Sequence, residues 1–421
     1  MKAPRNRRVF VIGRAAMTAL GATAETTWQR AVAGESGLRQ LSRCSVGTEI
    51  PMIVGEIPNR DRSNYVFDTP KERHNWNAAY VLQTIAVCQD ALAHAKLAMT
   101  PEVAPRTACL MGSAINGSDS LREAFLRFQS IGANGVSPFL LPNICANVPA
   151  GKAGAVLGFT GPIFSPQGAC ASGNHAIALG ARMVRDGDVD FALVGGVEMP
   201  LVSEIVLGFA NMNASFKLRK TDRAFAHPGQ ASRPFSIDRR GFVLAEGAAA
   251  VVLAADEVVA THGLKAFAEV AGVGWTSDAH HFTRPFQPTI VRAIREALAD
   301  AEIDAGAIGS INAHGTSTPT GDAVEIQCLR EILGDRLARV PISANKSQVG
   351  HSLGAAAAVE AVLALMALEQ QTVLPTLNHV PDPELAGPDF VTTSRHHGHE
   401  FVLSNSFGFG GTNCCVIFRG V

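Results

Sequence analysis

The sequence predicts an α/β fold, in which buried strands alternate with helices. Short, continuous apolar runs such as residues 9–13 are typical of strands that are covered on both faces. They alternate with segments of helical pattern such as residues 174–186. The alternation begins a second time after Asp256. We therefore expect a layered α/β protein built from two similar halves.

Each expected element follows from its own pattern, and no linker interrupts their succession. Continuous apolar runs predict strands at residues 9–13, 192–197, 248–254, 267–273, 308–313, 340–344 and 414–418. Apolar residues at helical spacing predict helices at residues 78–96, 174–186, 290–301 and 355–369. A boundary near residue 255 divides the chain into segments 1–255 and 256–421. Because no stretch rich in proline, glycine and serine separates the segments, we expect one rigid body.

Composition limits the classes of partner and site. The 421 residues are 47% hydrophobic and 17% charged, which is typical of a well-packed protein. A formal net charge of -1 offers no overall field to attract nucleic acid or an anionic membrane. The 8 cysteines lack the paired spacing of a zinc site, so we expect reduced thiols and no metal. Arg14 interrupts the first apolar run and no later run is long enough to span a bilayer, so we expect no signal peptide, no membrane helix and a cytoplasmic location.

Cys170 is the first candidate for chemistry. It lies in Gly-Ala-Cys-Ala-Ser-Gly at residues 168–173, immediately before the segment 174–186 that we expect to be helical. Unpaired N–H groups and the positive end of the helix dipole stabilise a thiolate at such a position. We therefore expect a lowered thiol pKa and a nucleophilic role. The alternative is a small, buried apolar residue, which is the usual fate of a free cysteine.

Three later segments supply possible partners for this thiol. His314 follows the expected strand 308–313, and His351 lies between another strand and a helix, where α/β sheets place catalytic groups. Either histidine alone could be structural, but a thiolate with two imidazoles is a familiar acyl-transfer set. The glycine-rich segment 405–413 would let backbone N–H groups approach a substrate oxygen closely.

Together these segments resemble the β-ketoacyl-(acyl carrier protein) synthases of the thiolase superfamily. The resemblance covers nearly the whole chain, and its motifs follow the family's order: residues 8–13, 168–173, 232–243, 314–325, 346–354 and 405–413. It implies a duplicated, five-layered α-β-α-β-α fold with mixed sheets, usually as a homodimer. It also implies an acyl carrier protein as the partner, with substrates carried on its phosphopantetheine and no cofactor of the enzyme's own.

The resemblance also implies a decarboxylative Claisen condensation. Cys170 would accept an acyl group from a carrier thioester, and a malonyl-type extender would then lose carbon dioxide and attack that acyl group. The backbone N–H groups of Cys170 and Phe409 would form an oxyanion hole. His314 and His351 would stabilise the enolate oxygen. Lys346 would pair with Glu325 and hold the histidine loops.

The same resemblance suggests residues that bind the substrate. Thr316 and Thr318 would hydrogen-bond the pantetheine arm, although plain turn hydroxyls are the alternative. Phe209 and Phe409 would gate the acyl pocket, against the alternative of ordinary core aromatics. The bottom of the pocket, near the dimer interface, would be lined by Ile115 and Leu140.

Related enzymes differ from this chain at single positions. The presence of both histidines argues against the type III initiating synthases, which have asparagine in place of one of them. Phe409 stands where a thiolase has a second catalytic cysteine. The retained Cys170 argues against a chain-length factor, the non-catalytic partner in aromatic polyketide systems.

The chain also departs from the family pattern. Gly168 in the turn before the nucleophile is unusual and is expected to loosen the approach to Cys170. Leu140 stands where Phe is frequent in fatty-acid synthases, which suggests a different acyl chain. Basic residues that meet an acidic carrier are replaced at residues 133–135 and 211–213. Those that remain are Lys71, Arg73, Lys217, Arg219, Lys220 and Arg223, so we expect a dedicated carrier from a specialised polyketide or polyene pathway.

Three interpretations remain. The favoured one is an elongating type II β-ketoacyl synthase, in fatty acid or polyketide chain elongation. The second is a ketosynthase subunit that works beside a chain-length-factor-like partner in aryl polyene or aromatic polyketide assembly. The third is a non-catalytic scaffold subunit that has kept its cysteine.

Overall fold

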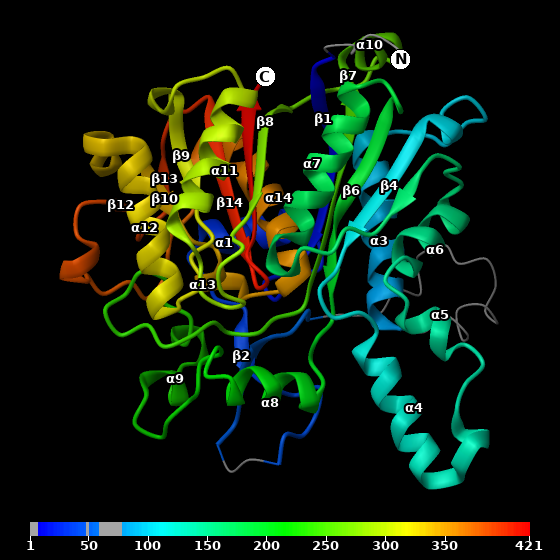
Figure 1. Cartoon of the computed structure of the whole chain (residues 1–421), viewed down its shortest axis with the longest axis vertical. Helices are drawn as coiled ribbons and strands as arrows, with labels where there is room; N and C mark the ends of the chain where they lie inside the picture. The colour runs from blue at the N-terminus through cyan, green and yellow to red at the C-terminus, as the bar shows by residue number, and fades with distance from the viewer. Residues whose placement is uncertain (1–6, 48–49, 59–77) are drawn as a thin grey trace.

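A mixed sheet of 11 strands runs through the protein (Figure 1). The computed structural model describes residues 7–47, 50–58 and 78–421. The strand order is β12-β10-β9-β14-β15-β8-β1-β7-β6-β4-β5. The N-terminal segment contributes β1 (Val9–Met17), β4 (Thr107–Gly112), β5 (Ile163–Phe164), β6 (Phe191–Glu198) and β7 (Gly247–Ala255). The C-terminal segment contributes β8 (Ala268–Ser277), β9 (Ile308–Asn312), β10 (Pro341–Ser343), β12 (Asp389–Phe390), β14 (Phe401–Gly408) and β15 (Thr412–Gly420).

The two halves of the sheet repeat one pairing pattern. In the first, β4 pairs in parallel with β5 and β6, and then β6, β7 and β1 follow antiparallel to one another. In the second, β9 pairs in parallel with β10 and β14, and then β14, β15 and β8 follow antiparallel to one another. The halves meet where β1 pairs antiparallel with β8. This repetition supports the division near residue 255, which remains our proposal.

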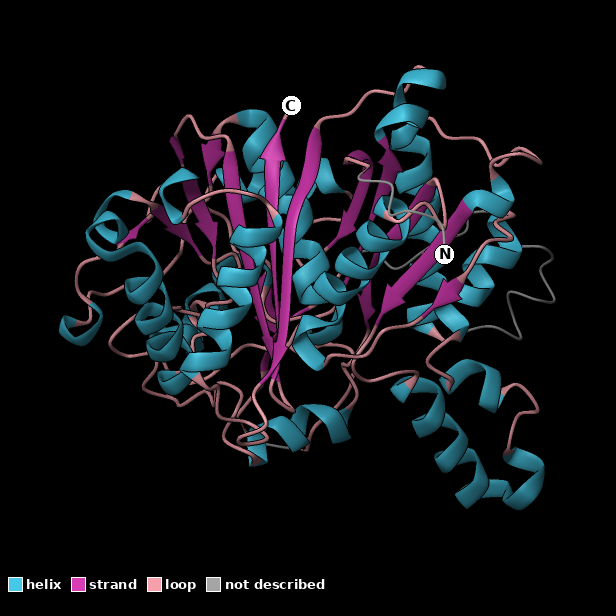
Figure 2. Ribbon diagram, turned by 45° about the horizontal axis from the view of Figure 1, so that its top comes forward, coloured by secondary structure: helices cyan, strands magenta, loops and turns pink. Residues whose placement is uncertain are grey.

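Helices complete five layers, in the order α-β-α-β-α (Figures 1 and 2). The central layer consists of α7 (Ser172–Arg185) and α14 (Ala356–Gln370), which contact each other and both halves of the sheet. The outer layers consist of α3 (Ala79–Ala95) and α6 (Val148–Leu157) on the first half, and of α11 (Gln287–Asp300) and α12 (Pro319–Leu333) on the second. The predicted α/β fold is therefore confirmed.

The central helix α14 is apolar around most of its circumference because it is packed on all sides. Residues 353–370 are long and apolar enough to cross a membrane by length and composition, but 89% of this stretch is buried inside the fold. Its partner α7 approaches closely because Gly173 has no side chain. A Cβ there would lie 2.5 Å from the backbone nitrogen of Ala358.

Most expected elements are found with small shifts at their ends. The elements that were not expected include β4, β14, α12 and α4 (Ser118–Ile131). The glycine-rich segment 405–413 is largely strand: β14 ends at Gly408, a tight turn follows, and β15 begins at Thr412. Shorter elements that complete the described chain are α1 (Ala24–Val32), β2 (Leu38–Gln40), β3 (Ile53–Gly55), α5 (Leu140–Ile144), α8 (Ser203–Asn211), α9 (Arg223–Ala226), α10 (Asp256–Thr261), α13 (Lys346–Val349), β11 (Thr372–Val373) and β13 (Arg395–His396).

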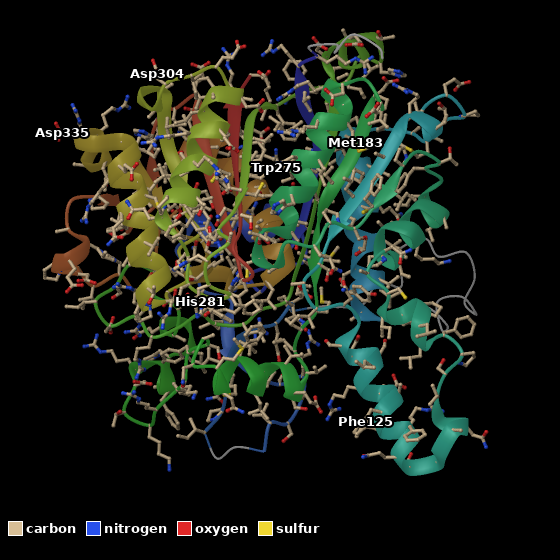
Figure 3. The ribbon with its side chains drawn as sticks, in the orientation of Figure 1. Phe125, Met183, Trp275, His281, Asp304 and Asp335 are labelled. Atoms are coloured by element: carbon tan, nitrogen blue, oxygen red, sulfur yellow. The ribbon has the colours of Figure 1, made fainter. Side chains whose placement is uncertain are left out.

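An arm formed by α4 and α5 projects from the body (Figure 2). In α4 the buried residue is Ala124, while Phe125 points outward (Figure 3). The exposed large apolar side chains of the whole arm are Leu121, Phe125, Leu126, Phe128, Ile131, Val136 and Leu141. We call this feature, residues 118–144, the apolar arm. Several exposed apolar side chains gathered on one arm are typical of an interaction site.

Candidate active site

Cys170 lies in a short turn, Ala169–Ala171, immediately before α7. The preceding residue, Ala169, has a φ of 49°, a left-handed conformation that is strained for a residue with a side chain. The turn is tied down on both sides. The N–H of Gly168 donates to Ser172 Oγ at 2.9 Å, and Thr412 Oγ1 donates to the carbonyl of Gly168 at 2.7 Å. The thiol therefore has the position before a helix that the sequence predicted, on a rigid support.

Gly168 does not loosen this turn, contrary to expectation. Its φ of -129° is open to any residue, so packing and not backbone strain requires the glycine. A Cβ there would lie 2.6 Å from Nδ1 of His175. The His175 ring stacks on Trp275, with centroids 6.3 Å apart, and its Nδ1 lies 3.0 Å from the carbonyl oxygen of Ala171. Gly168 and His175 thus fit each other.

Replacing Gly168 with Ala should destabilise the protein by about 1–3 kcal/mol, because the methyl group overpacks the space beside His175. The loss is measured by chemical unfolding. In a His175→Ala background the same substitution should cost much less, because the shorter side chain frees that space. Equal stability of Gly168→Ala and the unchanged protein would contradict this account.

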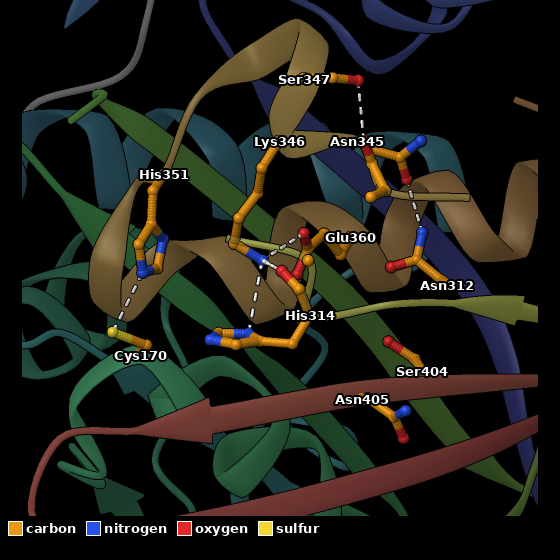
Figure 4. Close-up of polar contacts among 12 residues, drawn as sticks. Cys170, Asn312, His314, Asn345, Lys346, Ser347, His351, Glu360, Ser404 and Asn405 are labelled. Carbon is orange, nitrogen blue, oxygen red and sulfur yellow. Dashed lines mark hydrogen bonds and ion pairs between the residues drawn. The ribbon is translucent and has the colours of Figure 1, made fainter. Parts of the chain in front are cut away.

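The two histidines converge on the cysteine from the second half of the chain (Figure 4). Nε2 of His351 lies 3.2 Å from the sulfur of Cys170. His314, in the turn after β9, has its ring centroid 5.7 Å from that of His351. The backbone N–H of Phe409 donates to the sulfur of Cys170. The structure therefore brings together Cys170, His314, His351 and Phe409, which lie far apart in the sequence.

Lys346 does not form the expected pair with Glu325. Its buried ammonium contacts Glu360 Oε1 at 2.5 Å and donates to the carbonyl oxygen of His314 at 2.7 Å. Glu325 instead accepts the backbone N–H groups of His314 and Gly315, each at 2.8 Å. The two acids thus hold the His314 turn in different ways, one through the lysine and the other through the backbone.

Glu360 was missed from the sequence, although its position carries a signal. It is a lone carboxylate in the first turns of the apolar helix α14. A buried acid in such surroundings requires a partner. The sequence could have shown that Glu360 needs a cation, but not that Lys346 supplies it.

The contacts of Lys346 also fix the tautomer of His314. Its Nζ lies 3.5 Å from Nδ1 of His314. An ammonium group can only donate, so Nδ1 acts as the acceptor and the proton of the neutral ring is on Nε2. His314 consequently offers one N–H donor on the side away from the lysine.

Burial dominates the protonation of these groups. It raises the pKa of the Cys170 thiol to about 12, against the lowering effects of the Lys346 charge and the Phe409 N–H. The expected lowering of the thiol pKa is therefore wrong, because the loss of hydration outweighs the helix N-terminus. Burial, followed by the charge of Lys346, holds the pKa values of His314 and His351 well below their usual range. At neutral pH the site contains a thiol beside two neutral imidazoles.

Alkylation of Cys170 by iodoacetamide should consequently keep rising as the pH is raised from 7 to 10, because the thiolate fraction increases throughout that range. The rate is followed by mass spectrometry of the Cys170 peptide. Cys145, which is exposed, controls for the reagent in the same samples. A plateau that begins at neutral pH would contradict the raised pKa.

A cavity of about 630 Å³ opens over the cysteine. The predicted residues that line it are Cys170, His314, His351, Ile115, Phe209, Phe409, Thr316 and Thr318. Thr316 and Thr318 lie with their hydroxyl oxygens 2.9 Å apart. Leu140 is not among the lining residues, because α5 carries it on the apolar arm. The sequence did not reveal the loop from His281 to Pro285, which also lines the cavity.

The family description "Beta-ketoacyl synthase, N-terminal domain" matches residues 6–258, and "Beta-ketoacyl synthase, C-terminal domain" matches residues 267–380. The chain belongs to the β-ketoacyl synthase family. The resemblance predicted from the sequence is confirmed, and members of this family are acyltransferases that condense acyl chains.

Individual relatives agree over nearly the full length. The 3-oxoacyl-[acyl-carrier-protein] synthase 2 of Vibrio cholerae is 34% identical over 98% of this chain and 99% of its own. A chain of the ishigamide ketosynthase/chain length factor superposes with a TM-score of 0.90 and 27% identity, covering 99% of this chain and 100% of that one. A chain from a complex of a type II PKS acyl-carrier protein with its ketosynthase has a TM-score of 0.88 and 26% identity, with the same coverage.

Only some of the basic residues considered for carrier docking lie in the part of the chain that the structure describes. Lys71 and Arg73 lie outside the described residues. Lys217, Arg219 and Lys220 are exposed on the loop that follows α8, and Arg223 is exposed at the start of α9. This loop leaves the cavity at Asn213, whose side chain accepts a hydrogen bond from Lys217 at 2.8 Å. The exposed cations therefore begin at the mouth of the site.

Proposed function

We propose that this chain is an elongating β-ketoacyl synthase in which Cys170 carries the growing acyl group. The observation that carries the proposal is the meeting of Cys170 with neutral His351 and His314 in one cavity, under the N–H of Phe409. The substrates are an acyl thioester and a malonyl-type thioester, both on the phosphopantetheine of an acyl carrier protein. The enzyme needs no further cofactor for this reaction and works in the cytoplasm.

In the first half-reaction, His351 takes the thiol proton as the sulfur attacks the acyl carbonyl carbon. A neutral imidazole 3.2 Å from the sulfur is suited to this transfer. The N–H groups of Phe409 and Cys170 stabilise the oxyanion. The carrier's sulfur then leaves with the proton that His351 holds, and the acyl group stays on Cys170.

In the second half-reaction, the malonyl-type thioester loses carbon dioxide and becomes an enolate. The Nε2–H of His314 donates to the enolate oxygen. Once Cys170 is acylated, His351 no longer faces a thiol proton, so it can adopt its Nε2–H tautomer and act as the second imidazole donor. The enolate carbon attacks the acyl carbonyl, and the sulfur of Cys170 leaves as a thiolate, which then takes up a proton from solvent water. Lys346 and Glu325 act as positioning residues, because they hold the turn that presents His314.

The apolar arm supports the proposal that this chain binds a partner subunit. Its exposed aromatic and aliphatic side chains would be covered by a second chain, either another copy or a chain-length-factor-like subunit. We favour the self-sufficient dimer that is expected of an ordinary elongating synthase. Size-exclusion chromatography of the isolated chain distinguishes these alternatives. A self-sufficient synthase is expected to elute as a dimer, and a chain that needs a chain-length-factor-like partner is expected to elute as a monomer.

The carrier is proposed to be a dedicated one from a specialised pathway. The exposed Lys217, Arg219, Lys220 and Arg223 offer positive charge near the mouth, while residues 211–213 lack it. Equal turnover with the carrier of ordinary fatty acid synthesis would argue against this assignment.

The decisive test of the function is acylation of Cys170. The purified chain is incubated with an acyl-pantetheine thioester, and the mass of the Cys170 peptide is measured. We expect one acyl group per chain, which is absent from the Cys170→Ala variant. Absence of an adduct on the unchanged protein would favour the non-catalytic scaffold instead.

A further inference from the structure

Glu198, at the end of β6, is a buried carboxylate outside the reacting set. It accepts four hydrogen bonds: from the N–H of Ala114 at 2.7 Å, that of Ile115 at 3.0 Å, that of Gly354 at 3.1 Å, and from Ser113 Oγ at 3.2 Å. Four donors around one side chain are close to the full acceptor capacity of a carboxylate. These hydrogen bonds from backbone N–H groups indicate that Glu198 holds in place the loops to which those groups belong.

The donors belong to two different walls of the cavity. Ala114 and Ile115 follow β4 and line the cavity on the side where we place the acyl chain. Gly354 is in the turn that comes three residues after His351, and its neighbour Leu353 also lines the cavity. One carboxylate therefore links the acyl wall to the segment that carries the imidazole next to the sulfur.

The linked segments fit tightly and hold a strained backbone. A Cβ on Gly354 would lie 2.5 Å from the backbone nitrogen of Ala114, and one on Gly196 would lie 2.6 Å from the carbonyl oxygen of Gly354. Leu353 has a φ of 43°, a conformation that persists only when its surroundings enforce it. The hydrogen bond from Gly354 to Glu198 supplies part of that enforcement.

We propose that Glu198 is a positioning residue which fixes the acyl wall at Ala114 and Ile115 and the turn after His351 as one unit. The proposal rests on the function given above and extends it to selectivity. A shift of this unit changes both the room available to the acyl chain and the alignment of His351 with Cys170. The choice of acyl length and the rate of acylation therefore depend on the same carboxylate.

The test compares Glu198→Gln with Glu56→Gln. Glu56 is a matched control: it is buried, accepts the N–H groups of Ser42 and Arg43 and the hydroxyl of Ser42, and does not line the cavity. Acylation of Cys170 is measured with butyryl- and dodecanoyl-pantetheine. Glu198→Gln is expected to lower the acylation rate about tenfold or more and to change the ratio of the two rates. Glu56→Gln should leave that ratio unchanged.

A third variant separates geometry from charge. Glu198→Asp keeps the negative charge near Cys170 but shortens the arm by one methylene, so it cannot reach all four donors. A changed rate ratio in both Glu198 variants supports positioning by hydrogen bonds. An unchanged ratio in Glu198→Gln, or the same change in Glu56→Gln, would overturn the proposal.

Two outcomes need their own measurement. If Glu198→Gln does not fold, Ser113→Ala is measured instead, because it removes a single donor. A smaller change in the ratio of the two acylation rates then supports the proposal, and an unchanged ratio overturns it. If the unchanged protein accepts neither thioester, the proposed function fails. The rate of Cys170 alkylation by iodoacetamide, which needs no substrate recognition, still reports whether Glu198→Asp alters the contact between His351 and Cys170.

Discussion

Replacing His351 with Ala is expected to lower the rate of Cys170 acylation at pH 7 by about 10²- to 10⁴-fold. The reason is the thiol itself, whose pKa burial raises to about 12. Only a very small fraction is thiolate at neutral pH, so a nearby base must take the proton during attack. His351 is placed for that task, with Nε2 3.2 Å from the sulfur.

The acylation is followed by rapid quenching and mass spectrometry of the Cys170 peptide. In His351→Ala the residual rate should rise about tenfold per pH unit, because it depends on the thiolate fraction alone. His281→Ala is the control, since that histidine also lines the cavity but makes no contact with the cysteine among those described. A loss of less than tenfold would rule out His351 as the principal base.

Replacing Lys346 with Met is expected to destabilise the protein by about 3–5 kcal/mol, because it leaves the buried carboxylate of Glu360 without its cation. The unfolding free energy is measured with denaturant. The control is Arg419→Met, which breaks the exposed pair of Arg419 with Glu400 and should cost less than about 1 kcal/mol. Equal effects of the two substitutions would contradict a buried charge pair.

A double variant separates stability from chemistry. Lys346→Met/Glu360→Leu removes both charges and should recover most of the lost stability. Condensation should stay low in this variant, because no ammonium group holds the carbonyl oxygen and Nδ1 of His314. Full recovery of turnover would limit the role of Lys346 to neutralising Glu360.

The sequence was sufficient to predict the class of fold, and it was sufficient to propose the reacting side chains. Cys170, His314 and His351 each lie at a junction between elements, and local patterns reveal such junctions. The family resemblance then fixed their relation to one another. Strand order was beyond local patterns, because β14 pairs with β9 about ninety residues away in the chain and nothing local specifies that pairing.

Two errors at the site have the same physical origin. The helix N-terminus beside Cys170 is visible in the sequence, but the degree of burial that raises the thiol pKa is not. In the same way, the family resemblance paired Lys346 with Glu325, and only the packing of the folded chain shows that Lys346 contacts Glu360. Burial and side-chain pairing are set by packing across the whole molecule, so Glu198 and Glu360 became recognisable only with the fold.

The repeated pairing of strands has a consequence for the origin of the site. The turn before α7 and the turn before α14 occupy equivalent places in the two halves, and each begins with a strained residue, Ala169 at φ 49° and Leu353 at φ 43°. In one copy the next residue is Cys170, and in the other it is Gly354. The two turns contact each other. A doubled ancestor would thus have offered two identical loops in contact with each other, of which one now contains Cys170 and the other follows His351.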